Sequence, residues 1–268
     1  LCLVYCKLGD TVGRGGIKAL VYFEDLGKGA EALAELSSAS GQMDVPRIEM
    51  EELRARILLA SGGPAAAAGL GRMAADADSN VAHLGRYHLG RLAFLAGRYE
   101  EAVKTLSDLA ERHPSSPWAN DALELAMEVK GALPEGPGAL DLYRVATLAE
   151  ARGERPAAID SLAALERRFP ESSLAPRAIY MKASLEDAAE ARADLARLVE
   201  RHPVHELAPR ALERLAGLAE REDPADALSQ YVALMERYPE YPFMERVRER
   251  YAALGKTADP AAPEKGSR

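Results

Sequence analysis

A pair of histidines in the segment Glu200–Glu206 has the residue types of a metal site. The segment reads Glu-Arg-His-Pro-Val-His-Glu, which places the imidazoles of His202 and His205 between carboxylates, and zinc binds both ligand types. A short histidine pair without further spaced ligands is a weak metal signal, however. His202 also follows an Arg and precedes a Pro, as three other rings of the chain do. We therefore expect it to pack as an aromatic residue, and we predict no metal site.

The remaining chemistry-bearing residues do not form a recognisable active site. The glycines of Gly13–Gly16 precede an expected helix, but they lack the Lys-Ser/Thr ending of a P-loop and follow no strand, so a turn explains them better. His83 and His88 are expected on different faces of one helix. No serine or cysteine stands where a neighbouring base would activate it as a nucleophile. We predict no catalytic residue, no cofactor and no enzymatic activity in this chain.

A phrase that recurs four times indicates the elements that position these residues. Each copy reads Arg, an aromatic ring and Pro, and it ends at Pro114, Pro170, Pro203 or Pro239. Three columns of small or apolar residues keep fixed distances before each Pro: Ala102, Leu106 and Leu109; Ala158, Leu162 and Leu165; Ala191, Leu195 and Leu198; Ala227, Tyr231 and Leu234. Columns kept in register indicate an internal repeat, in which each unit buries its apolar face against its neighbours.

The repeat unit is expected to be a pair of antiparallel helices. The last three prolines are separated by 33 (170 to 203) and 36 (203 to 239) residues, which brackets the period of about 34 residues of helix hairpins. Alternating β-branched runs are absent from the sequence, so the chain is predicted to be all-α. The helices should end at glycines that adopt positive φ readily, or begin at capping aspartates. These residues are Gly97, Gly153, Asp187 and Asp223.

The unit from Leu89 to Pro114 resembles the tetratricopeptide repeat family. It has Leu-Gly90 in the first helix, Gly97-Arg-Tyr at the turn, Ala102 in the second helix and Pro114 at the exit, as 34-residue helix hairpins do. Gly90 and Ala102 are small, so the two helix backbones should approach closely. The resemblance implies a right-handed α-solenoid of antiparallel helix hairpins, which is a tetratricopeptide-like superhelix.

The same pattern suggests how the chain is organised along its length. Residues 1–80 are predicted to form degenerate hairpins of this kind, truncated at the start. Residues 81–255 should form the main array with a C-terminal capping helix. Between Pro114 and Pro170 the chain is longer than one period, which predicts one inserted helix near residues 116–131. Residues 256–268 lack apolar periodicity and are expected to be a disordered tail.

The family resemblance also implies where a partner would bind. In tetratricopeptide repeats the first helix of each pair lines a concave groove, and the residues at those places here are Tyr87, Arg91, Phe94, Tyr143, Thr147, Arg177, Tyr180 and Met181. Tyrosine and arginine anchor many protein interfaces. A second interpretation stays open for Tyr87, Phe94 and Tyr143, because aromatic residues at these places also suit the core between repeats.

Composition restricts the kind of partner. The chain carries 34 basic and 42 acidic residues and a formal net charge of −8, whereas a nucleic-acid surface needs a basic stripe. We therefore predict a protein or peptide partner and no nucleic acid. No stretch reaches the roughly 18 apolar residues that span a bilayer, so membrane association would require an anchor in a missing N-terminal portion.

These observations predict a non-enzymatic scaffold that presents a superhelical groove to a protein or peptide. The phrases His113-Pro-Ser-Ser116 and Phe169-Pro-Glu-Ser172 resemble those of bacterial cell-envelope members of the family, which include outer-membrane assembly lipoproteins and the periplasmic partner of the Tol–Pal system. The resemblance implies a role in envelope assembly or maintenance, in the periplasm or at the outer membrane; a cytoplasmic location also stays open. The alternative is a regulatory or substrate-positioning arm of an enzyme whose catalytic domain is absent from this chain.

Overall fold

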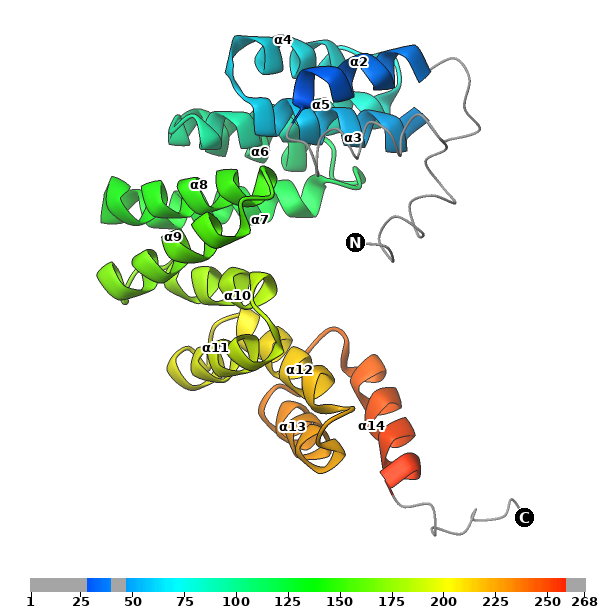
Figure 1. Ribbon diagram of the computed structural model, residues 1–268, viewed down its shortest axis with the longest axis vertical. Helices are drawn as coiled ribbons and strands as arrows, with labels where there is room; N and C mark the ends of the chain where they lie inside the picture. The colour runs from blue at the N-terminus through cyan, green and yellow to red at the C-terminus, as the bar shows by residue number, and fades with distance from the viewer. Residues whose placement is uncertain (1–27, 40–46, 259–268) are drawn as a thin grey trace, which may run out of the picture. The chain divides into compact units, whose positions relative to one another are not determined.

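The computed structural model describes residues 28–39 and 47–258, and over these residues every regular element is a helix (Figure 1). The helices are α2 (Gly29–Ala39), α3 (Arg47–Ser61), α4 (Gly63–Ala74), α5 (Ser79–Leu95), α6 (Tyr99–Arg112), α7 (Ala119–Ala132), α8 (Pro137–Ala151), α9 (Arg155–Arg168), α10 (Ala175–Leu185), α11 (Ala188–Arg201), α12 (Leu207–Ala219), α13 (Pro224–Arg237) and α14 (Met244–Ala258), with a 3₁₀ turn, η1 (Leu133–Glu135). The prediction of an all-α fold built from helix hairpins is confirmed. The handedness of the superhelix stays a prediction.

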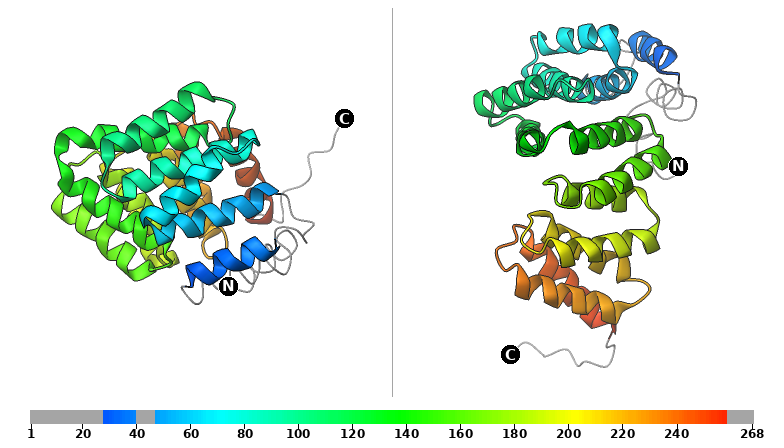
Figure 2. Two further views of the ribbon diagram at one scale, coloured as in Figure 1. Left: turned by 90° about the horizontal axis from the view of Figure 1, so that it is seen from above. Right: turned by 90° about the vertical axis from the view of Figure 1, so that its left-hand side faces the viewer.

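The chain divides into two compact units. Unit 1 ends at Ser161 and unit 2 begins at Leu162, so the boundary falls within α9. From α3 onward, short turns join successive helices within each unit (Figure 2). Helix α14 continues to Ala258, three residues into the segment predicted as a tail. The expected turn at Gly13–Gly16 and the rest of that tail lie outside the described residues, and the division into residues 1–80 and 81–255 stays a prediction.

The repeated columns form the contact surface of the second helix in each hairpin. The twelve residues of these columns lie on α6, α9, α11 and α13, and none is more than 2% exposed. Alanine in the first column allows a close approach, and the leucines or tyrosine of the other two columns fill the space beside it. The internal repeat therefore specifies which helix face is buried, as the sequence predicted.

Two glycines of α5 permit the closest helix contacts of unit 1. A Cβ atom at Gly90 would lie 2.5 Å from Cγ of Leu106, which confirms the predicted close approach of α5 and α6. A Cβ atom at Gly85 would lie 2.4 Å from the backbone nitrogen of Ala74, at the end of α4. The contact at Gly85 was not predictable, because glycine spacing alone does not show which neighbour lies opposite.

The helix ends follow the predicted chemistry. Gly97 and Gly153 both have φ of +73°, a conformation that glycine adopts at little steric cost. Asp187 accepts a hydrogen bond from the backbone nitrogen of Ala189 at 3.1 Å. Asp223 accepts one from Asp226 at 3.0 Å in the same way. Each carboxylate satisfies a free N–H at the first turn of α11 or α13.

The inserted helix is present as α7, and it alters the path of the chain beyond it. Leu106 and Leu109 of α6 pack against Ala122 and Ala126 of α7, so α7 occupies the place of the next hairpin's first helix. The chain then turns through η1 into α8 rather than into a second helix packed along α7. Gly136, with φ of +86°, allows this change of direction.

Helix α8 packs across the C-terminal ends of α3 and α5. Arg152 donates from Nε to the carbonyl of Ala60 at 3.1 Å, and Arg144 donates to the carbonyl of Leu95 at 3.3 Å. Both acceptors are among the last carbonyls of a helix, which have no partner within their own helix. The hydroxyl of Tyr99 donates to the Asp141 carboxylate at 2.6 Å. Polar contacts therefore fix α8 in unit 1.

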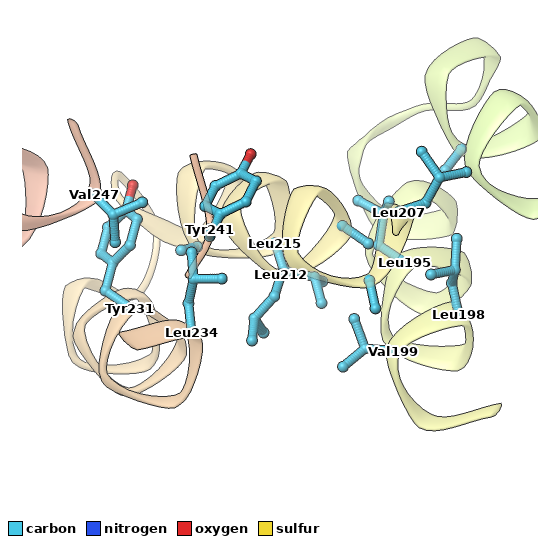
Figure 3. Packing of buried hydrophobic residues seen from close by; sticks show 14 of the residues in the cluster. Leu195, Leu198, Val199, Leu207, Leu212, Leu215, Tyr231, Leu234, Tyr241 and Val247 are labelled. Carbon is cyan, nitrogen blue, oxygen red and sulfur yellow. The ribbon is translucent and has the colours of Figure 1, made fainter. Parts of the chain in front are cut away.

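Unit 2 has its own apolar core. Figure 3 shows the side chains of α11, α12 and α13 in this cluster, with Leu195, Leu212 and Leu234 among those labelled. A network of charges lies beside it: Lys182 Nζ is 2.7 Å from the carboxylate of Asp194 and 3.5 Å from that of Glu186. Burial, followed by the negative charge of Asp194, raises the pKa of Glu186. Over the described residues no helix is both long and apolar enough to cross a bilayer.

The contact at Gly85 makes a sharp prediction for stability. Gly85→Ala should lower the free energy of unfolding by about 1–3 kcal/mol, because its methyl group meets backbone rather than a flexible side chain. Gly71→Ala is the matched control, since nothing lies within 4 Å of its added Cβ. It should raise stability by about 0.5–1 kcal/mol through helix propensity. Urea unfolding followed by circular dichroism measures both, and equal stabilities of the two variants would contradict the packing.

Candidate protein-binding groove

The histidine pair forms the turn of a repeat. The backbone N–H groups of His113, Phe169, His202 and Tyr238 donate to the carbonyl four residues earlier, with N–O distances of 2.8–3.0 Å. His202 thus has the same position in its turn as the other three rings. Over the described residues, no group of three or more His, Cys, Asp or Glu could hold a metal ion.

His205 replaces a serine in this turn. The hydroxyl of Ser116 accepts from the backbone nitrogen of Trp118 at 3.3 Å, and that of Ser172 accepts from Leu174 at 3.2 Å. Nδ1 of His205 accepts from Leu207 in the same way, at 3.2 Å. Burial lowers the pKa of His205, which keeps the ring nitrogen available as an acceptor. The residue therefore caps the start of α12.

A polar groove lies in unit 1 between α3, α5, α7 and the end of α8. Its volume is about 390 Å³. The residues that line this polar groove are Glu52, Arg56, Leu59, Tyr87, His88, Arg91, Trp118, Asp121, Glu150 and Ala151. Three of the lining residues are acidic and two are basic. The groove is therefore suited to hydrogen bonds and ion pairs rather than to a purely apolar ligand.

Tyr87 and Arg91 meet on the wall of the polar groove. They are one helical turn apart on α5, and the guanidinium carbon of Arg91 lies 5.6 Å from the centroid of the Tyr87 ring. Both side chains are half-buried. A guanidinium held over a ring keeps its N–H groups free at the edge and loses less entropy on binding. Tyr87 and Arg91, two of the residues predicted to bind a partner, therefore line the same groove.

The floor of the polar groove contains a buried imidazole. His88 is 3% exposed, and its Nδ1 has no hydrogen-bond partner in the part of the chain that the structure describes. Burial, and then the charges of Arg91 and Arg56, lower the pKa of His88 to about 3. The ring is therefore neutral at pH 7. Buried polar atoms without a partner are rare in native proteins.

Phe94 and Tyr143 are core residues, which corrects their prediction as groove residues. Phe94 is completely buried, Tyr143 is 5% exposed, and their ring centroids are 5.7 Å apart. The reason is the position of α8, which packs over the C-terminal end of α5. The Tyr143 hydroxyl donates to the carboxylate of Glu128 at 3.1 Å. The second interpretation, a core between helices, describes both rings.

The other predicted groove residues lie apart from the polar groove. Thr147 is half-buried on α8 and donates its hydroxyl to the carbonyl of Tyr143 at 2.9 Å. Arg177, Tyr180 and Met181 are half-buried on α10 of unit 2. Tyr180 lines a separate groove there. A binding role for these four residues stays a prediction.

Most lining residues of the polar groove were missed by the sequence analysis. Glu52 and Arg56 come from α3, which was assigned to a degenerate segment without groove residues. Trp118 and Asp121 come from the inserted helix. The spacing of these residues did contain a signal of a shared surface. The two residues of each pair are three or four positions apart, as Tyr87 and Arg91 are, and residues at that spacing lie on one helix face. Which faces meet depends on packing between helices, which this spacing does not give.

The buried imidazole predicts a dependence of stability on pH. The unfolded chain binds a proton at His88 near the ordinary pKa of 6.5, whereas the folded chain binds it only near 3. Stability should therefore fall as the pH falls below 6.5, by about 2 kcal/mol at pH 5 from this residue. His88→Gln removes the titration, so its stability should depend less on pH by that amount. Urea unfolding at pH 5 and pH 7 measures the difference, and identical pH profiles would contradict the assignment.

A family model supports the repeat. Residues 85–116 match the model of the family described as tetratricopeptide repeat. No curated protein matches the chain. A solved structure, the TPR2AB-domain:pHSP90-complex of yeast Sti1, is similar to it with a TM-score of 0.38 and 17% identity, over 92% of this chain and 99% of that one. The family match spans most of α5 and all of α6, where Gly90 allows the close approach and Gly97 ends the first helix. The chain therefore carries a tetratricopeptide repeat at residues 85–116.

Proposed function

We propose that the chain is a non-enzymatic scaffold that binds a protein segment in the polar groove. A tetratricopeptide repeat indicates a protein–protein interaction module. The observation that carries the proposal is the pairing of Tyr87 with Arg91 on the wall of a polar groove of about 390 Å³.

The side chains of the polar groove describe the partner segment that would fit. Arg56 and Arg91 contribute two positive charges, and Glu52, Asp121 and Glu150 contribute three negative ones. A segment with both a basic and an acidic residue complements this arrangement, and its backbone can hydrogen-bond to the polar wall. Trp118 at the start of α7 offers a ring against which an apolar side chain can pack.

The cell-envelope setting is part of the proposal and rests on sequence alone. The turns at His113–Ser116 and Phe169–Ser172 resemble those of bacterial envelope proteins with tetratricopeptide repeats. A role in envelope assembly or maintenance, in the periplasm or at the outer membrane, is the form of the function that this resemblance supports. The regulatory arm of an enzyme is the alternative, and the identity of the captured partner distinguishes the two.

The groove can be tested by affinity capture from native extract. The tagged chain and a Tyr87→Ala/Arg91→Ala variant are compared by mass spectrometry of the proteins that they retain. Removal of the tyrosine–arginine pair should reduce recovery of the specific partner by tenfold or more, because such residues are frequent hot spots of interfaces. Envelope proteins among the lost partners would support the envelope setting, and a catalytic protein would support the regulatory arm.

The capture needs a control that changes the surface elsewhere. Arg112→Ala/Met127→Ala alters a largely exposed arginine and a methionine that is 63% exposed, both outside the lining of the polar groove. This control should retain the partner as the unaltered chain does. Equal recovery by all three proteins would show that the partner binds elsewhere, provided that circular dichroism shows the variants folded.

A further inference from the structure

Unit 2 has a second groove, which differs in chemistry from the polar groove of unit 1. It lies between α10, α12 and α14 and has a volume of about 420 Å³. We call it the arginine groove, after four of its lining residues: Arg210, Arg214, Arg246 and Arg250. The rings of Tyr180 and Phe243 complete its wall. A concentration of arginine is unusual in a chain whose net charge is −8.

Only two of these arginines are neutralised by carboxylates within residues 28–39 and 47–258. Arg246 forms two hydrogen bonds of 2.8 Å to Glu213, and Arg250 lies 3.0 Å from the carboxylate of Glu220. Arg210 and Arg214 form no ion pair with any carboxylate of these described ranges. Four positive charges and two negative ones therefore leave a net charge of +2 at the arginine groove.

Glu213 is bound by Arg246 and Tyr241 rather than by Arg210 or Arg214. Glu213 is 8% exposed, and its carboxylate also accepts a hydrogen bond from Tyr241 at 2.7 Å. Burial opposes its ionisation, but the hydrogen bonds from Arg246 and Tyr241 outweigh this and lower the pKa of Glu213. The carboxylate is therefore ionised, and it accepts three hydrogen bonds from Arg246 and Tyr241. Figure 3 shows the Tyr241 hydroxyl directed away from the neighbouring Leu234.

Two of the guanidinium groups, those of Arg214 and Arg246, are held in place before any ligand arrives. Arg214 donates to the carbonyl of Ala183 at 3.0 Å, and its guanidinium carbon lies 5.9 Å from the Tyr180 ring centroid. Arg246 lies over Phe243 at 4.6 Å. A guanidinium that is stacked on a ring presents its N–H edge, which matches the two oxygens of a carboxylate.

An apolar pocket adjoins the arginine groove. It has a volume of about 520 Å³ and is lined by prolines and rings, among them Pro209, Tyr238, Pro239 and Pro242. Arg210, Tyr241 and Phe243 line both spaces, so the two lie side by side. Phe243 is 42% exposed, which is high for a phenylalanine. A ligand that fills both spaces must combine negative charge with an apolar group.

We propose that the arginine groove and the adjoining pocket bind an acidic segment of a partner protein, with a carboxylate on Arg210 and Arg214 and an aromatic or aliphatic side chain in the pocket. Charge complementarity selects this occupant, since the groove supplies two positive charges that lack a carboxylate among the described residues. Nucleic acid fits less well, because it carries a phosphate at every nucleotide and would bring negative charge into the pocket beside Glu206 and Glu240. The acidic segment places only an uncharged side chain there. The site is independent of the polar groove proposed above.

The proposal is tested with a fluorescein-labelled peptide of sequence Gly-Ser-Glu-Glu-Phe-Glu-Ser-Gly and fluorescence anisotropy. Two twins of this peptide carry glutamine in place of every glutamate, or alanine in place of phenylalanine. The acidic peptide should bind saturably and lose affinity as salt rises. Each twin should bind about tenfold more weakly, because it lacks either the charge or the apolar group.

Two variants of the chain locate the binding. Arg210→Gln removes an unpaired charge without breaking an ion pair, and it should weaken binding of the acidic peptide about tenfold. Gly217→Gln fills the groove without changing its charge; the added Cβ meets only the Arg250 guanidinium, at 3.6 Å, which is an ordinary contact. It should weaken binding to a similar extent. Arg221→Gln changes an exposed arginine outside the groove and should leave binding unchanged, as should Tyr87→Ala/Arg91→Ala.

Several results would overturn the proposal. They are the absence of saturable binding, equal binding of the glutamine twin, or affinity that survives both Arg210→Gln and Gly217→Gln. Loss of binding in Tyr87→Ala/Arg91→Ala would move the site to the polar groove. Tighter binding of an oligothymidylate than of the acidic peptide would identify a nucleic-acid surface. A dimer that becomes monomeric in Arg210→Gln, measured by light scattering, would show that a second copy of the chain fills the groove.

Discussion

The close approach of helix backbones is the constraint on which the rest of this structure depends. A single amphipathic hairpin has too little partner surface to bury its apolar face, so each helix needs the next one at short distance. Short distance requires small residues at the contact, and alanine recurs at that place in α6, α9, α11 and α13. Gly85 and Gly90 allow a still closer approach, since a Cβ atom at either position would overlap atoms of the opposite helix. When the helices pack this closely, the helix faces that do not contact a neighbour line the grooves.

The polar groove shows how a departure from the repeat creates a site. If α7 had been followed by a second helix packed along it, as α5 is followed by α6, the chain would have continued the regular stack. Instead η1 and Gly136 redirect it, and α8 crosses the ends of α3 and α5, where Arg144 and Arg152 satisfy free carbonyls. The end of α8 then supplies Glu150 and Ala151 to the groove. The same packing buries Phe94 and Tyr143. The position of α8 therefore both supplies part of the groove wall and keeps these two rings out of the groove.

How much could be predicted from the sequence depends on the range of each interaction. Local chemistry was predictable: the caps at Asp187 and Asp223, the positive φ at Gly97 and Gly153, and the buried columns all depend on neighbours within a few turns. The position of α8 was not, because it depends on hydrogen bonds between residues up to 92 apart, such as Arg152 and Ala60. His88 illustrates the limit. Its residue type and spacing predicted no catalytic role, and its place on the floor of a groove depends on several helices together.

Site-specific photo-crosslinking tests the central claim, that a partner protein occupies the polar groove, most directly. Benzoylphenylalanine is placed at Tyr87, inside the groove, or at Met127, which is on the outer face of α7 and 63% exposed. After irradiation in native extract, we expect a discrete adduct from position 87 and none from position 127. Adducts of equal yield from both positions, or from position 127 alone, would contradict the account.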